Sequence, residues 1–431
     1  MTATSVRRTD AAAATLGVLE RLFAGYERDF AVRLWDGTTW ESAPGQPARF
    51  TIVLNHAGSL RAMLRDPRRL QLSLADAFVN DDVDVEGDLE AIFPLADFLL
   101  KERHWGPREQ LWAARAVRAL PNAEGSQNGR ARPRLQGARD SADRLAQAVE
   151  YHYNLDPEFY GLFLDPRLVY TCAYFADHDE DIASAQERKL DYVCRKLRLK
   201  PGERLLDIGC GWGALVMHAV ERYGVEALGV TLSRPQAELA NERIRAAGLD
   251  DRCRVEMRDY RDVEGPFDKV SSIGMFEHLS EQGLAEYFER VFALLRPGGA
   301  FLNHGIGERY GKVRRRGGSF FMTYLFPDCV LLPISTPTRL AEAAGFEVRD
   351  VESLREHYAL TARAWRRQLE ANRDRAIAVA GAATYRVWRL GMAGFAWGED
   401  TGELNLWQSL LVKPATDSPS GLPLQRGDWY A

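Results

Sequence analysis

The most regular pattern along the chain is an alternation of short apolar runs with longer amphipathic segments between residues 204 and 307. The apolar runs are RLLDIGC, VEALGVTL, CRVEMRDY, FDKVSSIG and AFLNHGIG, and each predicts a β-strand. The segments 214–224, 234–248 and 283–299 repeat apolar residues with helical spacing. This alternation favours βαβ units, so the fold class we expect is α/β with a mostly parallel sheet.

The first 120 residues follow a different pattern. The run FAVRLWDGTTWE alternates around an Asp-Gly pair, which predicts a β-hairpin, and RFTIVLNH predicts a further strand. The stretch 59–105 predicts short helices with an acidic interruption. We therefore expect a small α+β domain over 1–120.

Two segments are poor in apolar side chains. Residues 121–140 are rich in Pro, Gly, Asn, Gln and Arg, which predicts a flexible linker. Its arginines permit two interpretations, a solvated linker or attraction to an anionic membrane surface: Arg130, Arg132, Arg134 and Arg139. We expect a second domain over 141–413 and a disordered tail, rich in Pro, Ser and Gly, over 414–431.

Composition excludes several classes of protein. The chain is 46% hydrophobic and 27% charged, as in an ordinary globular protein, and its net charge of -5 argues against nucleic acid as a partner. The five cysteines lack paired spacing, which argues against a disulfide framework or a metal site and fits a reducing cytoplasm. No apolar run approaches the ~18 residues of a transmembrane helix, and the N-terminus has no signal-peptide pattern.

A glycine-rich loop follows the first predicted strand of this α/β region. Gly209, Gly211 and Gly213 form G-x-G-x-G, whereas a dinucleotide site has G-x-G-x-x-G. The earlier third glycine favours a compact ligand against the backbone, such as S-adenosylmethionine. Asp207, at the end of the strand, is placed to accept a hydrogen bond from the ligand's ammonium.

The next two strands end in polar residues that suit the same ligand. Thr231 and Gln236 stand where many nucleotide sites place an acidic ribose ligand, and Asp259 and Tyr260 are placed to flank an adenine. The order of these motifs is that of a class I methyltransferase. The alternative is a structural glycine-rich turn in another α/β domain.

With these motifs in place, residues 150–412 resemble the cyclopropane fatty-acid and mycolic-acid synthase family. The segments occur in the family's order: YHYNLDPEFYGLFLDPRLVYTCAYF, AQERKLDYVCRKLRLKPGERLLDIGCGWG, GVTLSRPQ, DYRD, IGMFEHL, NHGIG, YLFPDCVLLP, HYALTARAW and LNLWQSLL. Residues 1–120 resemble, more loosely, the small lipid-associated domain of the long bacterial members. The resemblance implies a class I, Rossmann-like S-adenosylmethionine-dependent methyltransferase domain beside a smaller N-terminal α+β domain.

The resemblance also implies a reaction and a location. A cis double bond of a phospholipid acyl chain attacks the methyl group of S-adenosylmethionine, and bound bicarbonate removes a proton from the resulting carbocation, so that a cyclopropane closes. The implied protein is cytoplasmic, peripherally associated with the inner face of the cell membrane, and a homodimer. Its partners are the unsaturated acyl chains at the membrane surface.

The family's functional positions carry over residue by residue. The implied bicarbonate ligands are Cys172, Glu277, His304, Ile306 (through its backbone) and Tyr358. The implied cofactor contacts are Tyr170, Thr171, Leu205, Leu206, Asp207, Ile208, Gly209, Cys210, Gly211, Trp212, Gly213, Thr231, Leu232, Ser233, Gln236, Asp259 and Tyr260. The apolar, aromatic neighbours of Cys172 predict a neutral thiol rather than a nucleophile.

Several residues have a second interpretation. Four aromatic side chains either line an acyl channel and stabilise a cation through their faces or pack in the core: Tyr174, Phe175, Tyr324 and Trp365. We expect His278 to be structural. The basic run Arg314–Arg316 is either a solvated loop or a lip that contacts lipid headgroups.

The chain departs from the family at three positions. Asn303 and Gly305 replace an apolar residue and a threonine beside the anion site, and Met392 stands where many relatives have a cysteine. These changes leave two products open, a cyclopropane or a methylene-branched chain of the 10-methylene type from an oleoyl phospholipid. A small-molecule methyltransferase and a catalytically silent lipid-binding protein are further alternatives.

Overall fold

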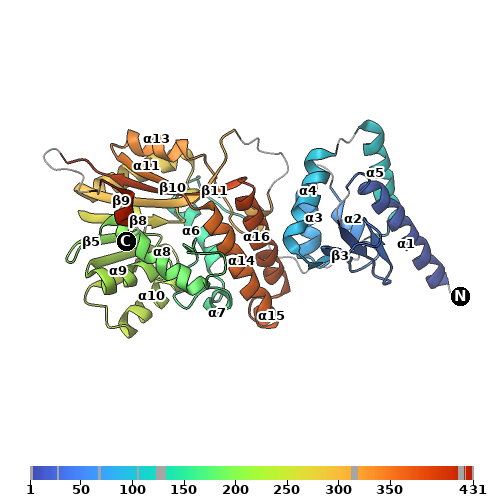
Figure 1. The fold of residues 1–431 in the computed structure, drawn as a ribbon, viewed down its shortest axis with the longest axis horizontal. Coiled ribbons are helices and arrows are strands. Elements are labelled where there is room, and N and C mark those ends of the chain that lie inside the picture. Colours follow the sequence, from blue (N-terminus) through green and yellow to red (C-terminus); the bar gives the residue numbers. More distant parts are fainter. Residues whose placement is uncertain are drawn as a thin grey trace. The chain divides into compact units, whose positions relative to one another are not determined.

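The computed structural model describes residues 3–26, 29–66, 69–103, 106–122, 133–311, 319–415, 422 and 424–429. These residues form two compact units (Figure 1). The first unit contains Met1–Arg132, Val313–Leu325 and Gly381–Gly394, and the second contains Pro133–Lys312, Phe326–Ala380 and Phe395–Ala431. Two segments from within the range expected for a continuous second domain therefore belong to the first unit.

The first unit is built on a four-stranded sheet in the order β2-β1-β3-β4. The predicted hairpin is present as antiparallel β1 and β2, while β1 and β3 run parallel. The strands are β1 (Phe30–Arg33), β2 (Thr39–Glu41), β3 (Phe50–Leu54) and β4 (Val83–Gly87). The helices are α1 (Ala3–Leu22), α2 (Ser59–Met63), α3 (Leu70–Val79), α4 (Ile92–Asp97), α5 (Pro107–Ala119) and α12 (Phe320–Tyr324), with short turns η2 (Leu89–Ala91) and η3 (Phe98–Glu102).

The strand β4 corrects the prediction for residues 59–105. The acidic stretch expected to interrupt helices is a strand that pairs antiparallel with β3. Its alternate residues Val83 and Val85 are buried, so the polar residues between them occupy the other face.

The second unit contains a seven-stranded sheet in the order β10-β11-β9-β8-β5-β6-β7 (Figure 1). The five strands predicted from the apolar runs are all present and pair in parallel, whereas β10 and β11 are antiparallel. The strands are β5 (Arg204–Ile208), β6 (Glu226–Thr231), β7 (Cys253–Met257), β8 (Phe267–Ile273), β9 (Leu295–Glu308), β10 (Glu347–Ser353) and β11 (Leu404–Val412). The expected α/β class is therefore confirmed.

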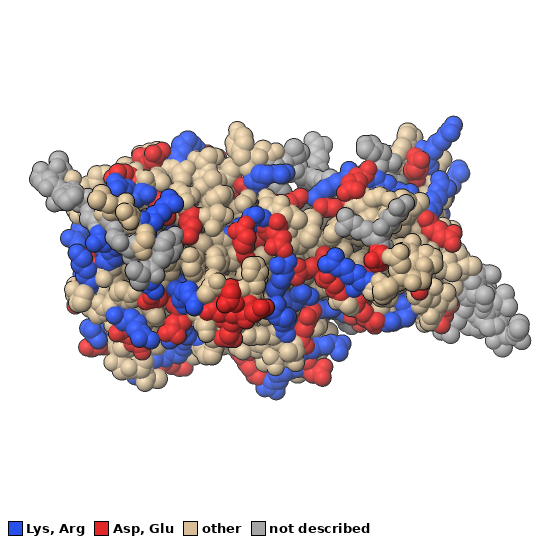
Figure 2. Space-filling view, in the orientation of Figure 1, with Lys and Arg blue, Asp and Glu red and all other residues tan. Residues whose placement is uncertain are grey.

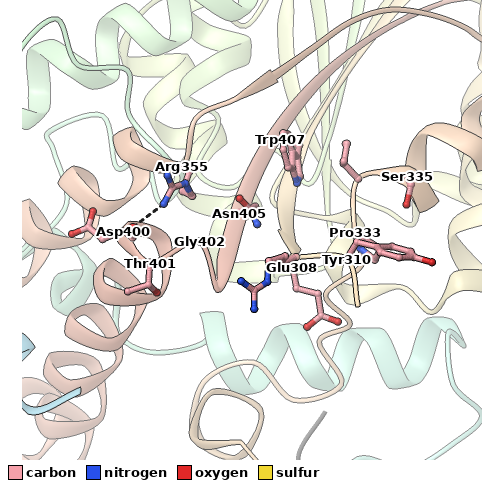
Figure 3. Close-up of a pocket in the computed structure, with 12 residues that line it drawn as sticks. Glu308, Tyr310, Pro333, Ser335, Arg355, Asp400, Thr401, Gly402, Asn405 and Trp407 are labelled. Atoms are coloured by element: carbon pink, nitrogen blue, oxygen red, sulfur yellow. Dashed lines mark hydrogen bonds between the residues drawn. The ribbon is translucent and has the colours of Figure 1, made fainter. Parts of the chain in front are cut away.

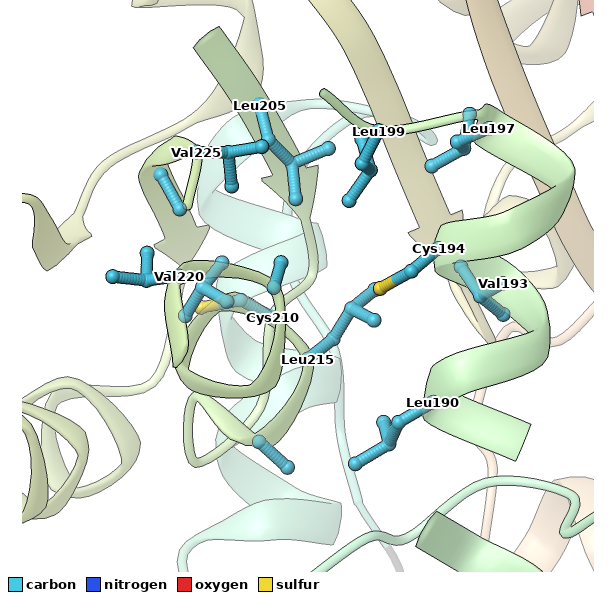
Figure 4. Packing of buried hydrophobic residues seen from close by; sticks show 14 of the residues in the cluster. Leu190, Val193, Cys194, Leu197, Leu199, Leu205, Cys210, Leu215, Val220 and Val225 are labelled. Carbon is cyan, nitrogen blue, oxygen red and sulfur yellow. The ribbon is translucent and has the colours of Figure 1, made fainter. Parts of the chain in front are cut away.

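Helices cover both faces of this sheet. One face packs on α8, α9 and α10, and Figure 4 shows the α8–α9 part of that core. The other face packs on α11 and α13. The helices of the second unit are α6 (Ala142–Tyr153), α7 (Pro157–Gly161), α8 (Ile182–Leu197), α9 (Ala214–Tyr223), α10 (Arg234–Ala246), α11 (Glu281–Leu294), α13 (Ser335–Ala343), α14 (Arg355–Ala371) and α15 (Arg373–Ala380), with turns η4 (Tyr260–Asp262), η5 (Phe276–His278) and η6 (Arg426–Trp429). The helix α16 (Ala382–Asp400) begins in the first unit, which includes Gly381–Gly394, and ends in the second.

Successive residues of β5 point to opposite faces, as a strand buried on both sides requires. Leu205 packs toward α8 and α9, while Leu206 packs toward α11. This register leaves the carboxyl ends of β5, β6, β8 and β9 at one edge, where sites form in open α/β sheets.

Several sequence expectations concern charge and membranes. Within the described ranges, no helix is long and apolar enough to cross a membrane. Basic and acidic side chains are interspersed on the face shown in Figure 2. The arginines Arg130, Arg132 and Arg314–Arg316 lie outside the described residues. Arg139 donates to the carbonyl of Asp328 at 2.6 Å.

The range expected to form a tail is described only in part. In it, Arg426 pairs with the buried Asp350 at 2.6 Å, between guanidinium nitrogen and carboxylate oxygen.

Candidate active site

The glycine-rich loop leaves β5 in a conformation that favours glycine. Gly209, Gly211 and Gly213 have φ values of 78°, 56° and 81°. Gly213 immediately precedes α9, and a Cβ on it would lie 3.2 Å from the Cβ of Ala240. Because these glycines have no side chains, a ligand at the end of β5 can approach the loop backbone closely.

Asp207 lies in β5 just before this loop and is buried. Its Oδ1 accepts a hydrogen bond from the Ser271 hydroxyl of β8 at 2.7 Å. Burial raises the pKa of Asp207 to about 6, and the Ser271 hydrogen bond and the Lys189 charge oppose that rise. The side chain is thus held between two parallel strands and is ionised at neutral pH.

The ends of β6 and β7 carry the next predicted cofactor contacts. The Thr231 hydroxyl donates to Gln236 Oε1 at 2.8 Å, and the Ser233 hydroxyl caps α10. Asp259 is held by Arg261, with Nη2 2.6 Å from Oδ2, and Tyr260 is buried. The Asp259 carboxylate is therefore already paired with a cation.

The remaining cofactor positions are hydrophobic. Leu205, Leu206 and Ile208 are core residues of β5, and Cys210 is buried under β6. Trp212 is buried with its ring centroid 5.0 Å from that of Tyr160, while Leu232 packs at the edge of the core.

The stretch Tyr170–Cys172 crosses the same edge of the sheet. The Tyr170 ring lies among aromatic rings, with Trp365 at 5.1 Å between centroids. Gln186 of α8 donates to the Thr171 carbonyl at 2.8 Å. A Cβ on Gly274, the residue after β8, would lie 3.5 Å from Thr171 Cγ2, so Thr171 meets the end of β8.

Cys172 is buried, with Sγ 3.1 Å from the Ala173 carbonyl. Burial, and secondarily the charge of Glu399, raises the pKa of the Cys172 thiol well above its usual range. The thiol is therefore neutral and unsuited to nucleophilic attack.

Glu277 lies in the turn η5 and is 4% exposed. Its carboxylate accepts a hydrogen bond from the backbone N–H of Ile306, while its Oε2 has no partner among the described residues. Burial raises the pKa of Glu277 to about 7, and backbone hydrogen bonds oppose the rise. The structure thus brings Glu277 and the Ile306 backbone together.

His304 of β9 is 1% exposed. The amide nitrogen of Gln408 lies 3.2 Å from its Nδ1. With the amide in this orientation, its N–H donates to Nδ1 and the ring proton is assigned to Nε2. Burial, aided by Lys189 and Lys196, lowers the pKa of His304 to about 3, so the ring is neutral. Its Nε2 has no partner within the described part of the chain.

Tyr358 lies in the first turns of α14, and its ring packs edge-on against Phe395 with centroids 4.6 Å apart. Burial, and then the neighbouring Cys172, Tyr170 and Glu277, raises the pKa of the Tyr358 hydroxyl well above its usual range. These neighbours place the hydroxyl among the other predicted site residues as a neutral donor.

The departures from the family pattern have distinct surroundings. A Cβ on Gly305 would lie 2.1 Å from Phe276 Cε1 and 2.9 Å from Glu277 Oε2, so the Phe276 ring fills that space. Asn303 is within 3.3 Å of the Tyr287 hydroxyl through its Oδ1. Met392 belongs to a segment of the first unit.

The four aromatic residues that are candidates for an acyl channel belong to different units. The Tyr324 hydroxyl donates to Asp76 at 2.5 Å within the first unit. Trp365 contacts Tyr170, Phe175 is buried, and Tyr174 stacks on His357 with centroids 4.5 Å apart. Three of the four therefore lie beside the predicted site in the second unit.

Glu399, near the end of α16, is a buried acid that the sequence pattern does not reveal. It is 0% exposed, and neither carboxylate oxygen has a partner in the described ranges. Burial raises the pKa of Glu399 to about 9, with Arg355 opposing the rise. In the sequence GFAWGED it resembles a solvated acid at a helix end.

A separate open pocket, about 710 Å³ in volume, lies where β9 ends beside β11 (Figure 3). Arg355 borders it and donates to the Asp400 carbonyl at 2.8 Å. None of the predicted site residues lines this pocket. Among the described residues, no cluster of His, Cys, Asp and Glu has the geometry of a metal site.

Comparison with known proteins identifies the class of the second unit's fold. The mycolic acid cyclopropane synthase CmaA1, solved as a complex with SAH and CTAB, covers 62% of this chain and 98% of its own at 34% identity, with a TM-score of 0.58. The cyclopropane synthase MmaA2 from Mycobacterium tuberculosis aligns at 31% identity over 62% of this chain and 98% of its own, with a TM-score of 0.57. The fold and cofactor loop define an S-adenosylmethionine-dependent methyltransferase.

The family follows from the sequence matches. The model for mycolic acid cyclopropane synthetase matches residues 140–409, and a domain of unknown function matches 18–97. A probable fatty acid methyltransferase of Pseudomonas putida is 37% identical over 404 residues, covering 93% of this chain and 95% of that protein. The chain belongs to the mycolic acid cyclopropane synthetase family, as the resemblance predicted.

The raised pKa of Glu277 predicts a pH effect on stability. Because the protonated carboxyl is favoured in the folded state, its contribution is full below its ordinary pKa of 4.5 and is lost as pH rises through about 7. Glu277→Gln removes this loss. The free energy of unfolding of the variant, compared with that of wild type, should therefore rise by a few kcal/mol between about pH 5 and pH 8. Urea denaturation in bicarbonate-free buffer measures it.

The control for this measurement is Glu281→Gln, which removes an exposed carboxyl from the start of α11. That variant should follow wild type at both pH values. A Glu277→Gln protein with the pH dependence of wild type would contradict the assigned burial effect.

Proposed function

We propose that the protein transfers the methyl carbon of S-adenosylmethionine to the cis double bond of unsaturated phospholipid acyl chains and closes a cyclopropane ring. The observation that carries the proposal is a pair of buried polar atoms at one edge of the sheet, His304 Nε2 and Glu277 Oε2, that find no hydrogen-bond partner among the described residues. A buried polar atom is normally hydrogen-bonded, so this edge is built for a small polar group that the protein itself does not supply.

The chemistry of the donors fits a small anion such as bicarbonate. His304 and Tyr358 are neutral donors, the Ile306 backbone N–H lies beside the Glu277 carboxylate, and Glu277 accepts or donates according to its protonation. When bound, bicarbonate would supply the weak base that a carbocation needs to lose its proton. The five residues Cys172, Glu277, His304, Ile306 and Tyr358 would hold it.

The protein's own contribution to this chemistry is alignment in a dry site. An alkene is a weak nucleophile, so the reaction depends on holding the acyl chain in line with the sulfonium methyl group. The aromatic rings around Tyr170 exclude water and offer their faces to the developing positive charge. The neutral Cys172 forms part of the wall and takes no covalent part.

A second product is supported by a specific observation. The relative that matches 93% of this chain is a probable fatty acid methyltransferase, and Gly305 leaves the Phe276 ring directly beside Glu277. If a hydride first shifts from the methyl-bearing carbon to the neighbouring cationic carbon, the positive charge moves to the methyl-bearing carbon. Loss of a proton from the methyl group then gives a methylene-branched acyl chain. The remaining family expectations, a peripheral location at the inner face of the cell membrane and a homodimer, accompany this proposal.

The proposed function is tested by product analysis. Incubation with S-adenosylmethionine and vesicles of cis-monounsaturated phospholipid should add one CH₂ to the acyl chain, as seen by mass spectrometry of the methyl esters. The two products are isomers, so proton NMR must separate them. Upfield ring protons support the cyclopropane, vinylic protons support the methylene branch, and no mass gain on any unsaturated lipid would contradict both.

The site assignment is tested by His304→Ala. This variant should lose turnover by at least about a hundredfold, the scale of a lost catalytic hydrogen bond, while calorimetry shows S-adenosylhomocysteine binding within about twofold of wild type. His218→Ala is the matched control, because His218 is equally buried but lies on α9 away from the strand ends. Loss of cofactor binding in His304→Ala alone would show that the two sites are not separate.

A further inference from the structure

A buried lysine lies beneath the stretch that joins the predicted cofactor and anion sites. Lys189 of α8 is 1% exposed, and its Nζ donates to the Thr171 hydroxyl at 2.9 Å. Throughout the described part of the chain, no carboxylate forms an ion pair with this ammonium. A buried cation without a paired anion is costly, so its retention calls for an explanation.

A second buried lysine on the same helix is paired with carboxylates, as buried charges usually are. Lys196, also 1% exposed, lies 3.4 Å from Asp350 Oδ2 and also pairs with Glu352. Its charge is thus neutralised inside the protein. Lys189, seven residues earlier, is equally buried but has a hydroxyl where Lys196 has two carboxylates.

The two carboxylates whose charges act on Lys189 accept hydrogen bonds from other groups. Asp165 accepts from the backbone N–H groups of Arg167 and Val169, each at 2.9 Å, and Asp207 accepts from Ser271. Burial lowers the pKa of Lys189 to about 8, while Cys172, Asp165, Asp207 and Cys194 oppose the decrease in that order. The ammonium is therefore still charged at neutral pH.

The position of Lys189 indicates which part of a bound ligand would pair with its ammonium group. Thr171 meets the end of β8, and Asp207 stands at the end of β5. The adenine contacts are expected at β6 and β7, so the amino-acid end of an elongated cofactor reaches the β5–β8 side. Cys172, the next residue after Thr171, is one of the residues proposed to hold the small anion.

We propose that Lys189 is the fixed cation that receives a carboxylate-type anion in the active site. The anion is either the cofactor's own carboxylate or the small anion of the proposed reaction, and both present oxygens to an ammonium in the same way. Thr171 holds the ammonium toward that group. The bicarbonate alternative rests on the proposed function, whereas the cofactor alternative requires only that the protein binds S-adenosylmethionine.

Lys189→Met tests the proposal, because it removes the charge and keeps the side-chain length. The control is Gln186→Met, one turn earlier on α8, which removes a neutral donor to the same stretch. Calorimetry compares S-adenosylhomocysteine with its decarboxylated analogue, which differs only in the anion. This binding measurement needs no lipid and no turnover, so it tests the role of Lys189 even if the proposed product is wrong.

Each source of the anion gives its own result. If it is the cofactor carboxylate, Lys189→Met should weaken S-adenosylhomocysteine binding by at least about tenfold and abolish the preference over the analogue, while Gln186→Met keeps the preference. If it is the small anion, that preference should persist in Lys189→Met, and half-maximal activity should require at least about tenfold more bicarbonate. If a folded Lys189→Met protein shows neither the loss of preference nor the higher bicarbonate requirement, the proposal is overturned.

Wild-type protein supplies a second test if the variant does not fold. Deprotonation of Lys189 should weaken anion binding as pH rises through about 8, with the carboxylate-bearing ligand or bicarbonate losing affinity and the decarboxylated analogue unaffected. Affinities for both anions that stay constant from about pH 7 to pH 8.5 would overturn the assignment.

Discussion

The exclusion of water from the carboxyl ends of β5, β8 and β9 is the constraint on which the rest of this structure depends. Asp207, Cys172, Glu277 and His304 lie at this edge, and each is at most 4% exposed. Burial shifts each pKa toward the neutral form. Cys172 and His304 are therefore uncharged at neutral pH. Such a dry setting suits the proposed reaction, in which water would otherwise capture the cationic intermediate.

The fold produces this dry edge by packing helices on both faces of the sheet and closing its end with other elements. The turn η5 brings Glu277 to Ile306, and α14 brings Tyr358 to Cys172. Gln408, from the antiparallel strand β11, brings its side-chain amide within hydrogen-bond distance of His304 Nδ1. Each polar group thus depends on an element distant in sequence, so the edge is a property of the whole second unit.

Much of the second unit was predictable from local patterns. The strands β5 to β9 follow apolar runs, and the glycine loop follows from its spacing, because both are determined by neighbouring residues. The strand β4 escaped prediction since VDVEG is short and half acidic, and its pairing with β3 supplies what its composition does not. The assignment of 313–325 and 381–394 to the first unit depends on long-range packing and has no local signature.

The same distinction applies to the candidate site. Resemblance named the residues at the sheet edge, but Lys189 and Glu399 were not among them. In sequence both look like ordinary charges on amphipathic helices, and only their burial without a paired charge marks them as unusual. Isolated charges of this kind are recognisable once the surrounding packing is known.

The most direct measurement of the central claim is the dependence of the initial rate on bicarbonate in carbon-dioxide-free buffer. If neutral donors at this edge hold a small anion that takes the proton, the rate should fall to near zero without bicarbonate and recover along a saturating curve. A rate that stays undiminished in its absence would contradict the account, because the unpartnered atoms of His304 and Glu277 would then serve another purpose.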